Sequence, residues 1–202
     1  MWYDLFSLVY DRALEDLYRP FRPKAVEALR LHPGDAVLDV PCGTGQSLDG
    51  LVAAVGSSGR VLGVDRSSGM LRRARRRAAG PVTLRQAPAE AVDAALLVDA
   101  IGRPDVDGVL CALGLTALPD GEATFERLFG LVRPGGRFVL FDVYAAERTR
   151  QTRAVERIAR ADLSRRAWEP LVARCADAGR EVLPADPATF GGELYVAWGT
   201  RP

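Results

Sequence analysis

The chain has 202 residues, of which 48% are hydrophobic and 26% charged, and its formal net charge is +1. This length and balance predict one ordinary globular domain and exclude the strongly basic surface that nucleic-acid-binding proteins carry. No stretch is apolar for long enough to span a bilayer, and the first residues lack the basic start of a signal peptide. We therefore expect a cytoplasmic protein with no nucleic-acid partner.

The chain begins with a pattern typical of an amphipathic helix over residues 2–18, apolar on one face and mainly acidic on the other. We expect residues 1–31 to form a helical cap, either packed on the domain or acting as a lid over a ligand. The acidic face disfavours stable membrane insertion and leaves a peripheral membrane contact as an alternative. A second helix is predicted over residues 24–31. His32, the single histidine, follows in a turn at the end of the sheet away from any ligand.

The next segment, residues 37–47, is an apolar strand that leads into a glycine-rich turn and then a helix. Asp39 ends the strand, and Pro41, Gly43 and Gly45 follow at alternate positions. Glycines let the backbone bend sharply and let a ligand approach it closely, and the free N–H groups of the following helix point toward that ligand. The segment therefore predicts a ligand-binding turn.

A second short strand, residues 61–65, ends in Asp65, about 20 residues beyond the glycines. A carboxylate at this distance is suited to accept hydrogen bonds from the hydroxyl groups of a ribose. The G-x-G-x-x-G pattern of dinucleotide-binding proteins is incomplete, because Leu48 occupies the third glycine position. A nicotinamide-dependent oxidoreductase is therefore the disfavoured alternative.

Two runs together, D-V-P-C-G-T-G at residues 39–45 and D-R-S-S-G-M-L at residues 65–71, resemble consecutive motifs of class I S-adenosylmethionine-dependent methyltransferases of the small-molecule and lipid type. Pro41 stands where that family has its first glycine. The resemblance implies S-adenosylmethionine as cofactor and a small-molecule or lipid methyl acceptor. It also implies an α/β fold: a Rossmann-like three-layer sandwich whose seven-stranded, mostly parallel sheet has an antiparallel C-terminal strand. A non-catalytic cofactor-binding or partner module remains an alternative.

The later elements fit one methyltransferase domain over residues 1–202, with the cofactor-binding core at 35–143 and a C-terminal helix and closing hairpin at 144–202. Strands are predicted at 82–86, 107–113, 138–143, 180–183 and 193–199. Helices are predicted at 70–79, 88–101, 121–132 and 150–178, with Ser67 as a helix N-cap. A glycine-rich turn is expected at 133–137.

The resemblance assigns cofactor contacts to residues after the first, second, third and fourth strands. The set is Asp39, Pro41, Gly43, Gly45, Asp65, Arg66, Met70, Pro88, Ala89, Glu90 and Leu113. The family carries an acid for the adenine amino group where this chain has Pro88. The backbone N–H of Ala89 and the carboxylate of Glu90 are the nearest substitutes.

For the chemistry, Tyr10, Asp142 and Tyr144 are the candidate catalytic residues. Methyl transfer requires orientation of the acceptor and exclusion of water, and the single His and scattered Cys residues predict no metal site. A hydroxyl acceptor needs a base, whereas aromatic faces stabilise the cation that N-methylation produces, which favours a nitrogen acceptor. O- or C-methylation of a natural product or quinone is the alternative, and the oligomeric state has no signal in the sequence.

Overall fold

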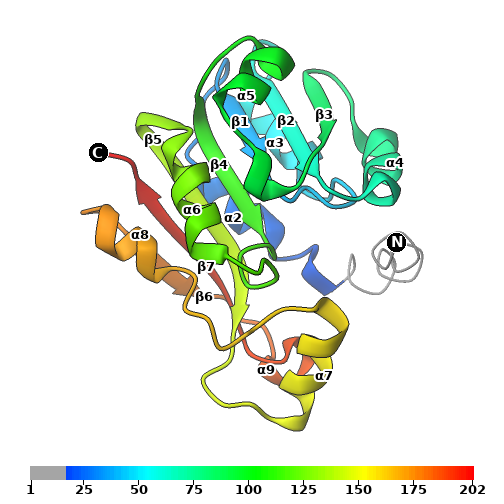
Figure 1. Cartoon of the computed structure of the whole chain (residues 1–202), viewed down its shortest axis with the longest axis vertical. Coiled ribbons are helices and arrows are strands. Elements are labelled where there is room, and N and C mark those ends of the chain that lie inside the picture. Colours follow the sequence, from blue (N-terminus) through cyan, green and yellow to red (C-terminus); the bar gives the residue numbers. More distant parts are fainter. Residues whose placement is uncertain (1–16) are drawn as a thin grey trace.

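The computed structural model describes residues 17–202, and its centre is one seven-stranded sheet with the order β3-β2-β1-β4-β5-β7-β6 (Figure 1). The strands are β1 (Ala36–Asp39), β2 (Arg60–Asp65), β3 (Val82–Gln86), β4 (Val106–Ala112), β5 (Val132–Tyr144), β6 (Gly179–Val182) and β7 (Glu193–Thr200). Neighbours among β1 to β5 pair in parallel, and β7 runs antiparallel to both β5 and β6. The predicted α/β fold class is confirmed.

Helices cover both faces of this sheet and produce the three-layer arrangement. They are α2 (Arg22–Ala28), α3 (Leu48–Val55), α4 (Ser68–Arg77), α5 (Ala94–Ile101), α6 (Gly121–Gly130), α7 (Arg150–Ala159), α8 (Glu169–Arg174) and α9 (Pro187–Phe190), with a 3-10 turn, η1 (Ala89–Ala91). One buried cluster joins the sheet to α2, α3, α4 and α9, and a second joins its other face to α5, α6 and α8.

Strand β1 shows that both faces of the sheet are buried. Its side chains alternate between the two clusters, with Val37 in the first and Ala36 and Leu38 in the second. Because both faces are buried, the strand reads as a continuous apolar run instead of an apolar–polar alternation.

Three predicted elements differ from the structure. The single helix expected over 150–178 is two helices, α7 and α8, because Arg160 takes a left-handed backbone (φ 53°) and ends α7. The helix expected over 88–101 begins as η1 and becomes α-helical only after Asp93, whose side chain accepts a hydrogen bond from Leu96 N. The turn at 133–137 lies inside β5, at a register irregularity opposite Val106 and Gly108.

The topology gathers the acidic strand ends at one edge of the sheet. Asp39 ends β1, Asp65 ends β2, and Asp142 lies near the end of the parallel strand β5. His32 lies before β1, where its exposed ring has Nδ1 3.6 Å from Asp35 Oδ2. In an open α/β sheet, ligands bind outside the carboxyl ends of the parallel strands, the edge opposite to His32.

Candidate active site

A cleft opens at the carboxyl ends of β1, β2, β4 and β5. It is lined by Tyr18, Arg22, Pro41, Cys42, Gly43, Thr44, Gln46, Asp65, Arg66, Met70, Ala112, Leu113, Gly114, Thr116, Ala117, Leu118, Asp142, Val143, Val155, Ala159, Ala161 and Leu163. Six of the predicted cofactor contacts and one predicted catalytic residue are therefore brought together: Pro41, Gly43, Asp65, Arg66, Met70, Leu113 and Asp142.

The carboxylate of Asp65 fastens two loops at one end of this cleft. Its Oδ2 accepts from Gly43 N at 2.9 Å, and its Oδ1 accepts from Ser67 N at 2.8 Å. Ser67 in turn caps α4, because its hydroxyl accepts from Met70 N at 3.1 Å, as predicted. One buried carboxylate thus holds the glycine turn against the start of α4 and also lines the cleft, and a carboxylate oxygen has lone pairs for more than one donor.

The two glycines of the turn do different things. Gly43 (φ 54°) lines the cleft, and a Cβ on it would meet nothing within 4 Å. Gly45 (φ 81°) does not line the cleft; a Cβ there would lie 2.7 Å from Leu48 Cδ1 and 3.2 Å from Ala74. Gly45 therefore lets the turn pack on α3 and α4, while Gly43 leaves room for a bound molecule.

Asp39 lies beneath the cleft instead of lining it, because its side chain points to the face of the sheet that α2 covers. Burial raises its pKa to about 7, the positive charge of Arg22 opposes that rise, and the negative charge of Asp65 adds to it. Arg22 belongs to α2 and lines the cleft, with Nη1 donating to Ser47 Oγ at 3.0 Å. Sequence patterns did not single out Arg22; its position beside Pro23 at a helix start was the only local signal.

At the other end of the cleft, Asp142 is almost fully buried. Its Oδ1 accepts from Thr116 Oγ1 at 2.9 Å and from Val143 N at 2.9 Å. Its Oδ2 is buried and has no hydrogen-bond partner within residues 17–202. Burial raises the pKa of Asp142 to about 6, and the two hydrogen bonds hold it below what burial alone would give. The arrangement offers one carboxylate oxygen to a proton donor.

Tyr144, the second candidate on β5, does not line the cleft. Its hydroxyl accepts from Arg166 Nε at 3.3 Å, and its ring meets Trp168 edge-on with centroids 4.9 Å apart. These contacts hold it toward α8. Tyr10 lies outside the described residues, as does most of the predicted cap helix.

The predicted adenine contacts follow directly after Ala87, whose N–H donates to the carbonyl oxygen of Asp65 at 3.2 Å. Pro88, Ala89 and Glu90 are not among the lining residues of the cleft, because Ala89 and Val92 pack in the core cluster beside α6 and fix η1 there. Leu113 does line the cleft, and its left-handed backbone (φ 55°) is uncommon for a side chain of this size. Backbone conformations of this kind are frequent at ligand sites.

Among residues 17–202, no three His, Cys, Asp or Glu side chains come together as a metal ion would require. Within the same range, every helix is too short or too polar to cross a bilayer.

Comparison with known proteins agrees with this geometry. The family described as "Methyltransferase domain" matches residues 37–136. Demethylmenaquinone methyltransferase of Desulfitobacterium hafniense is 30% identical over 145 residues, covering 70% of this chain and 54% of that protein. The 2-phytyl-1,4-naphtoquinone methyltransferase of Synechococcus elongatus is 30% identical over 151 residues, covering 70% of this chain and 62% of that protein. The chain thus spans little more than half the length of these relatives.

The solved structures give the same fold. Geranyl diphosphate C-methyltransferase from Streptomyces coelicolor, in complex with Mg2+, geranyl diphosphate and S-adenosyl-L-homocysteine, superposes with a TM-score of 0.69 at 16% identity, covering 94% of this chain and 81% of that chain. This chain belongs to the class I S-adenosylmethionine-dependent methyltransferases. S-adenosylmethionine is the cofactor of this methyltransferase, and the nicotinamide alternative has no support among these matches.

The cleft of the methyltransferase suits each part of that cofactor. The Asp65 carboxylate matches a ribose diol, and the Arg22 guanidinium matches the carboxylate of the methionine end. Met70 and Leu113 offer apolar surface for the adenine ring. The open space over Gly43 leaves the backbone accessible. The residues present therefore fit the cofactor, and within residues 17–202 the side-chain carboxylates that line the cleft are those of Asp65 and Asp142.

We predict that Asp65→Asn weakens S-adenosylmethionine binding by roughly 1–3 kcal/mol, because an amide accepts through one oxygen and leaves a buried donor unpaired. Isothermal titration calorimetry measures the loss. Asp99→Asn, at an exposed ion pair with Arg85, is the matched control and keeps the wild-type affinity. Equal affinities for the two variants would place the ribose elsewhere.

A second prediction concerns pH and Asp39. Its folded-state pKa of about 7 exceeds the ordinary value of 3.8, so the native state binds the proton more tightly and the free energy of unfolding falls as pH rises between these values. Asp39→Asn removes that dependence. The variant is expected to be more stable than wild type at about pH 8 and to lose most of the advantage by about pH 5, as measured by urea unfolding.

The control for this prediction is Asp49→Asn, at an exposed position of α3. Its stability relative to wild type should stay constant across the same pH range. A pH-independent difference between Asp39→Asn and wild type would show that Asp39 is ionised in the native state throughout.

Proposed function

We propose that this domain transfers the methyl group of S-adenosylmethionine to an oxygen, or to a ring carbon activated by that oxygen, of an apolar small-molecule or lipid acceptor. The observation that carries the proposal is the division of the cleft. Polar groups of Asp65 and Gly43 lie at one end, and Asp142 lies at the other among apolar side chains, including Val143 and Leu163.

Asp142 supplies the function that a hydroxyl acceptor needs. A catalytic base works best when its pKa lies near the working pH, and burial brings the pKa of this carboxyl to about 6. Thr116 holds Oδ1, and Oδ2, which is buried without a hydrogen-bond partner within residues 17–202, is the atom that takes the proton of the acceptor hydroxyl. The deprotonated acceptor would then be the nucleophile, and the carbon–sulfur bond of the cofactor would break as the methyl group passed to it. When bound, the cofactor supplies that methyl group on a sulfonium already prepared to leave.

The surrounding residues position the acceptor and exclude water. Apart from Asp142, the cleft residues from β5 and the segment after it are apolar, which suits a ring or chain better than a charged molecule. The named relatives that act on a menaquinone precursor and a naphthoquinone derivative are consistent with a quinone-like acceptor. Such an acceptor gives Asp142 a hydroxyl to deprotonate in its reduced form.

The nitrogen acceptor expected from the sequence stays an alternative prediction. Its basis was a set of aromatic faces near the methyl group, but Tyr144 lies against Trp168 and only Tyr18 is an aromatic residue of the cleft within residues 17–202. The cytoplasmic location, the cap at residues 1–31 and the absence of a nucleic-acid partner also stay predictions.

The direct test combines binding with turnover. Calorimetry with S-adenosylmethionine and with NADH should give binding of the first alone. Incubation with S-adenosylmethionine and either 1,4-dihydroxynaphthalene or 1-naphthylamine, with S-adenosylhomocysteine measured as product, should give turnover with the hydroxyl compound. Turnover with the amine alone would support nitrogen methylation, and cofactor binding without turnover on any acceptor would support a non-catalytic module.

The role of Asp142 predicts a specific pH profile. The kcat/KM should rise with pH and reach half its plateau near pH 6, because only the ionised carboxylate accepts the proton. Thr116→Val removes a hydrogen bond that stabilises the ionised form, so the profile should move to higher pH. Thr116→Ser keeps the hydroxyl and is the control with the wild-type midpoint. A profile unchanged in Thr116→Val would mean that Asp142 is not the base.

A further inference from the structure

The segment from Glu147 to Arg165, which we call the acceptor wall, forms part of the lining of the cleft. It consists of α7, the residues just before it and the loop that follows, and it contributes Val155, Ala159, Ala161 and Leu163 to the lining. All four side chains are apolar. No motif in the sequence pointed to this segment, and none of the cofactor contacts assigned above comes from it.

The loop of the acceptor wall is fixed directly to the strand ends that carry Asp142. Asp162 N donates to Thr116 O at 2.8 Å, and Ala145 N donates to Leu163 O at 2.8 Å. Arg165 Nη1 donates to Leu118 O at 2.6 Å. Because Thr116 also donates its hydroxyl to Asp142, the wall and the base share one anchoring residue.

Helix α7 is held at its other side by α9. Thr152 Oγ1 donates to Gly191 O at 2.9 Å, and Val155 packs so closely that a Cβ on Gly191 would lie 2.9 Å from its Cγ2. The two helices lie side by side at the end of the molecule furthest from α5 (Figure 1). The apolar side chains of the wall therefore stand on a fixed support.

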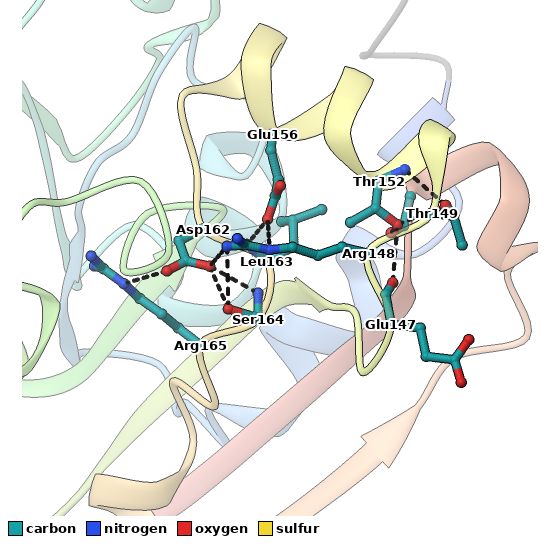
Figure 2. A network of polar contacts seen from close by, with 10 residues as sticks. Glu147, Arg148, Thr149, Thr152, Glu156, Asp162, Leu163, Ser164 and Arg165 are labelled. Atoms are coloured by element: carbon teal, nitrogen blue, oxygen red, sulfur yellow. Dashed lines mark hydrogen bonds and ion pairs between the residues drawn. The ribbon is translucent and has the colours of Figure 1, made fainter.

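Arg148 joins the helix of the wall to its loop, and Figure 2 shows its side chain reaching past Glu156 to Asp162. Arg148 Nη2 donates to Asp162 Oδ1 at 2.8 Å, and its Nε lies 3.4 Å from Glu156 Oε1. Glu156 Oε1 also accepts from Leu163 N at 3.2 Å. One guanidinium thus holds the carboxylate that fixes Leu163 in the cleft.

The charge state of this network suits that role. Hydrogen bonds from Ser164 and then from Arg148 lower the pKa of Asp162, so its carboxylate is ionised at neutral pH. Each exposed ion pair alone contributes little stability, but Arg148 joins two carboxylates that both bond to the loop. Its removal should loosen the loop locally and leave the core intact.

We propose that the acceptor wall is the acceptor-binding surface of this methyltransferase, that Val155 and Ala159 limit the size of the acceptor, and that Arg148 is a positioning residue for Leu163. The chemistry of the wall selects a flat apolar ring whose hydroxyl group reaches Asp142. This inference rests on the proposed function, because it places the acceptor of that same reaction.

The first test places a larger side chain on the acceptor wall. We choose 1-naphthol as a fluorescent hydroxyl-bearing ring and titrate it into the ligand-free protein and the protein loaded with S-adenosylhomocysteine. Ala159→Phe should weaken 1-naphthol binding by about tenfold or more, because the added ring takes the space of the ligand. Ile158→Phe, on the exposed side of the same helix, should bind 1-naphthol as wild type does.

The second test loosens the wall without entering the cleft. Arg148→Ala should raise the KM for 1,4-dihydroxynaphthalene several-fold while kcat and the affinity for S-adenosylhomocysteine stay near wild type. Amide hydrogen exchange should become faster in residues 160–165. Arg148→Lys keeps the charge, so its KM should lie between those of Arg148→Ala and wild type. Arg153→Ala, at an exposed position of α7, is the matched control and should keep the wild-type KM.

These experiments separate the inference from the proposed function. Wild-type protein that binds S-adenosylmethionine and methylates 1,4-dihydroxynaphthalene, with 1-naphthol binding equal in Ala159→Phe and Ile158→Phe, overturns the acceptor wall alone. Wild-type protein that fails to bind 1-naphthol also overturns it. Failure to bind S-adenosylmethionine would overturn the proposed function itself.

Discussion

The carboxylate of Asp65 is the contact on which the cofactor end of the cleft depends. It accepts from the N–H of Gly43 and from the N–H of Ser67, so it joins the turn after β1 to the start of α4. Without the carboxylate, two buried donors would lose their partners, and the turn would lose the orientation that leaves Gly43 open to a ligand.

Buried charge is the constraint at the opposite end. Burying a carboxylate is unfavourable, and a protein that needed only stability would replace Asp142 or Asp39 by an apolar side chain. At both residues burial raises the pKa, to about 6 and about 7 respectively. Raised values of this kind cluster at functional sites because they keep a proton exchangeable at neutral pH. Asp142 lines the cleft, whereas Asp39 lies beneath it near Arg22, so the two buried carboxyl groups belong to different parts of the site.

The sheet and the cofactor end were predictable because their signals are local. A strand buried on both faces is a short apolar run, and a turn that needs positive φ contains glycine, so β1, β2 and the motif between them can be recognised from consecutive residues. The same local logic misplaced Tyr144. Position on β5 puts it beside Asp142 in sequence order, but the contacts that draw it away come from Arg166 and Trp168, in the segment just before α8.

The helix predicted over 150–178 fails for a related reason. Its apolar spacing resembles one continuous helix, and the left-handed Arg160 that ends α7 is not a glycine and gives no local stop signal. What stabilises the break is tertiary: the backbone bond from Asp162 to Thr116, and the ion pairs of Arg148. A bond between residues as far apart in the chain as Asp162 and Thr116 leaves no periodic pattern in the sequence, so sequence analysis could not predict the break.

The two ends of the cleft therefore differ in how the chain encodes them, and Thr116 joins two parts of the acceptor end. Its hydroxyl fixes the Asp142 carboxylate, and its carbonyl fixes the loop that carries Leu163. The acceptor wall and Asp142 are thus joined through one short segment after β4, while the bonds from Gly43 and Ser67 to Asp65 lie at the other end of the cleft. Acceptor choice can change in such a structure without loss of the cofactor site, since the two depend on separate sets of hydrogen bonds.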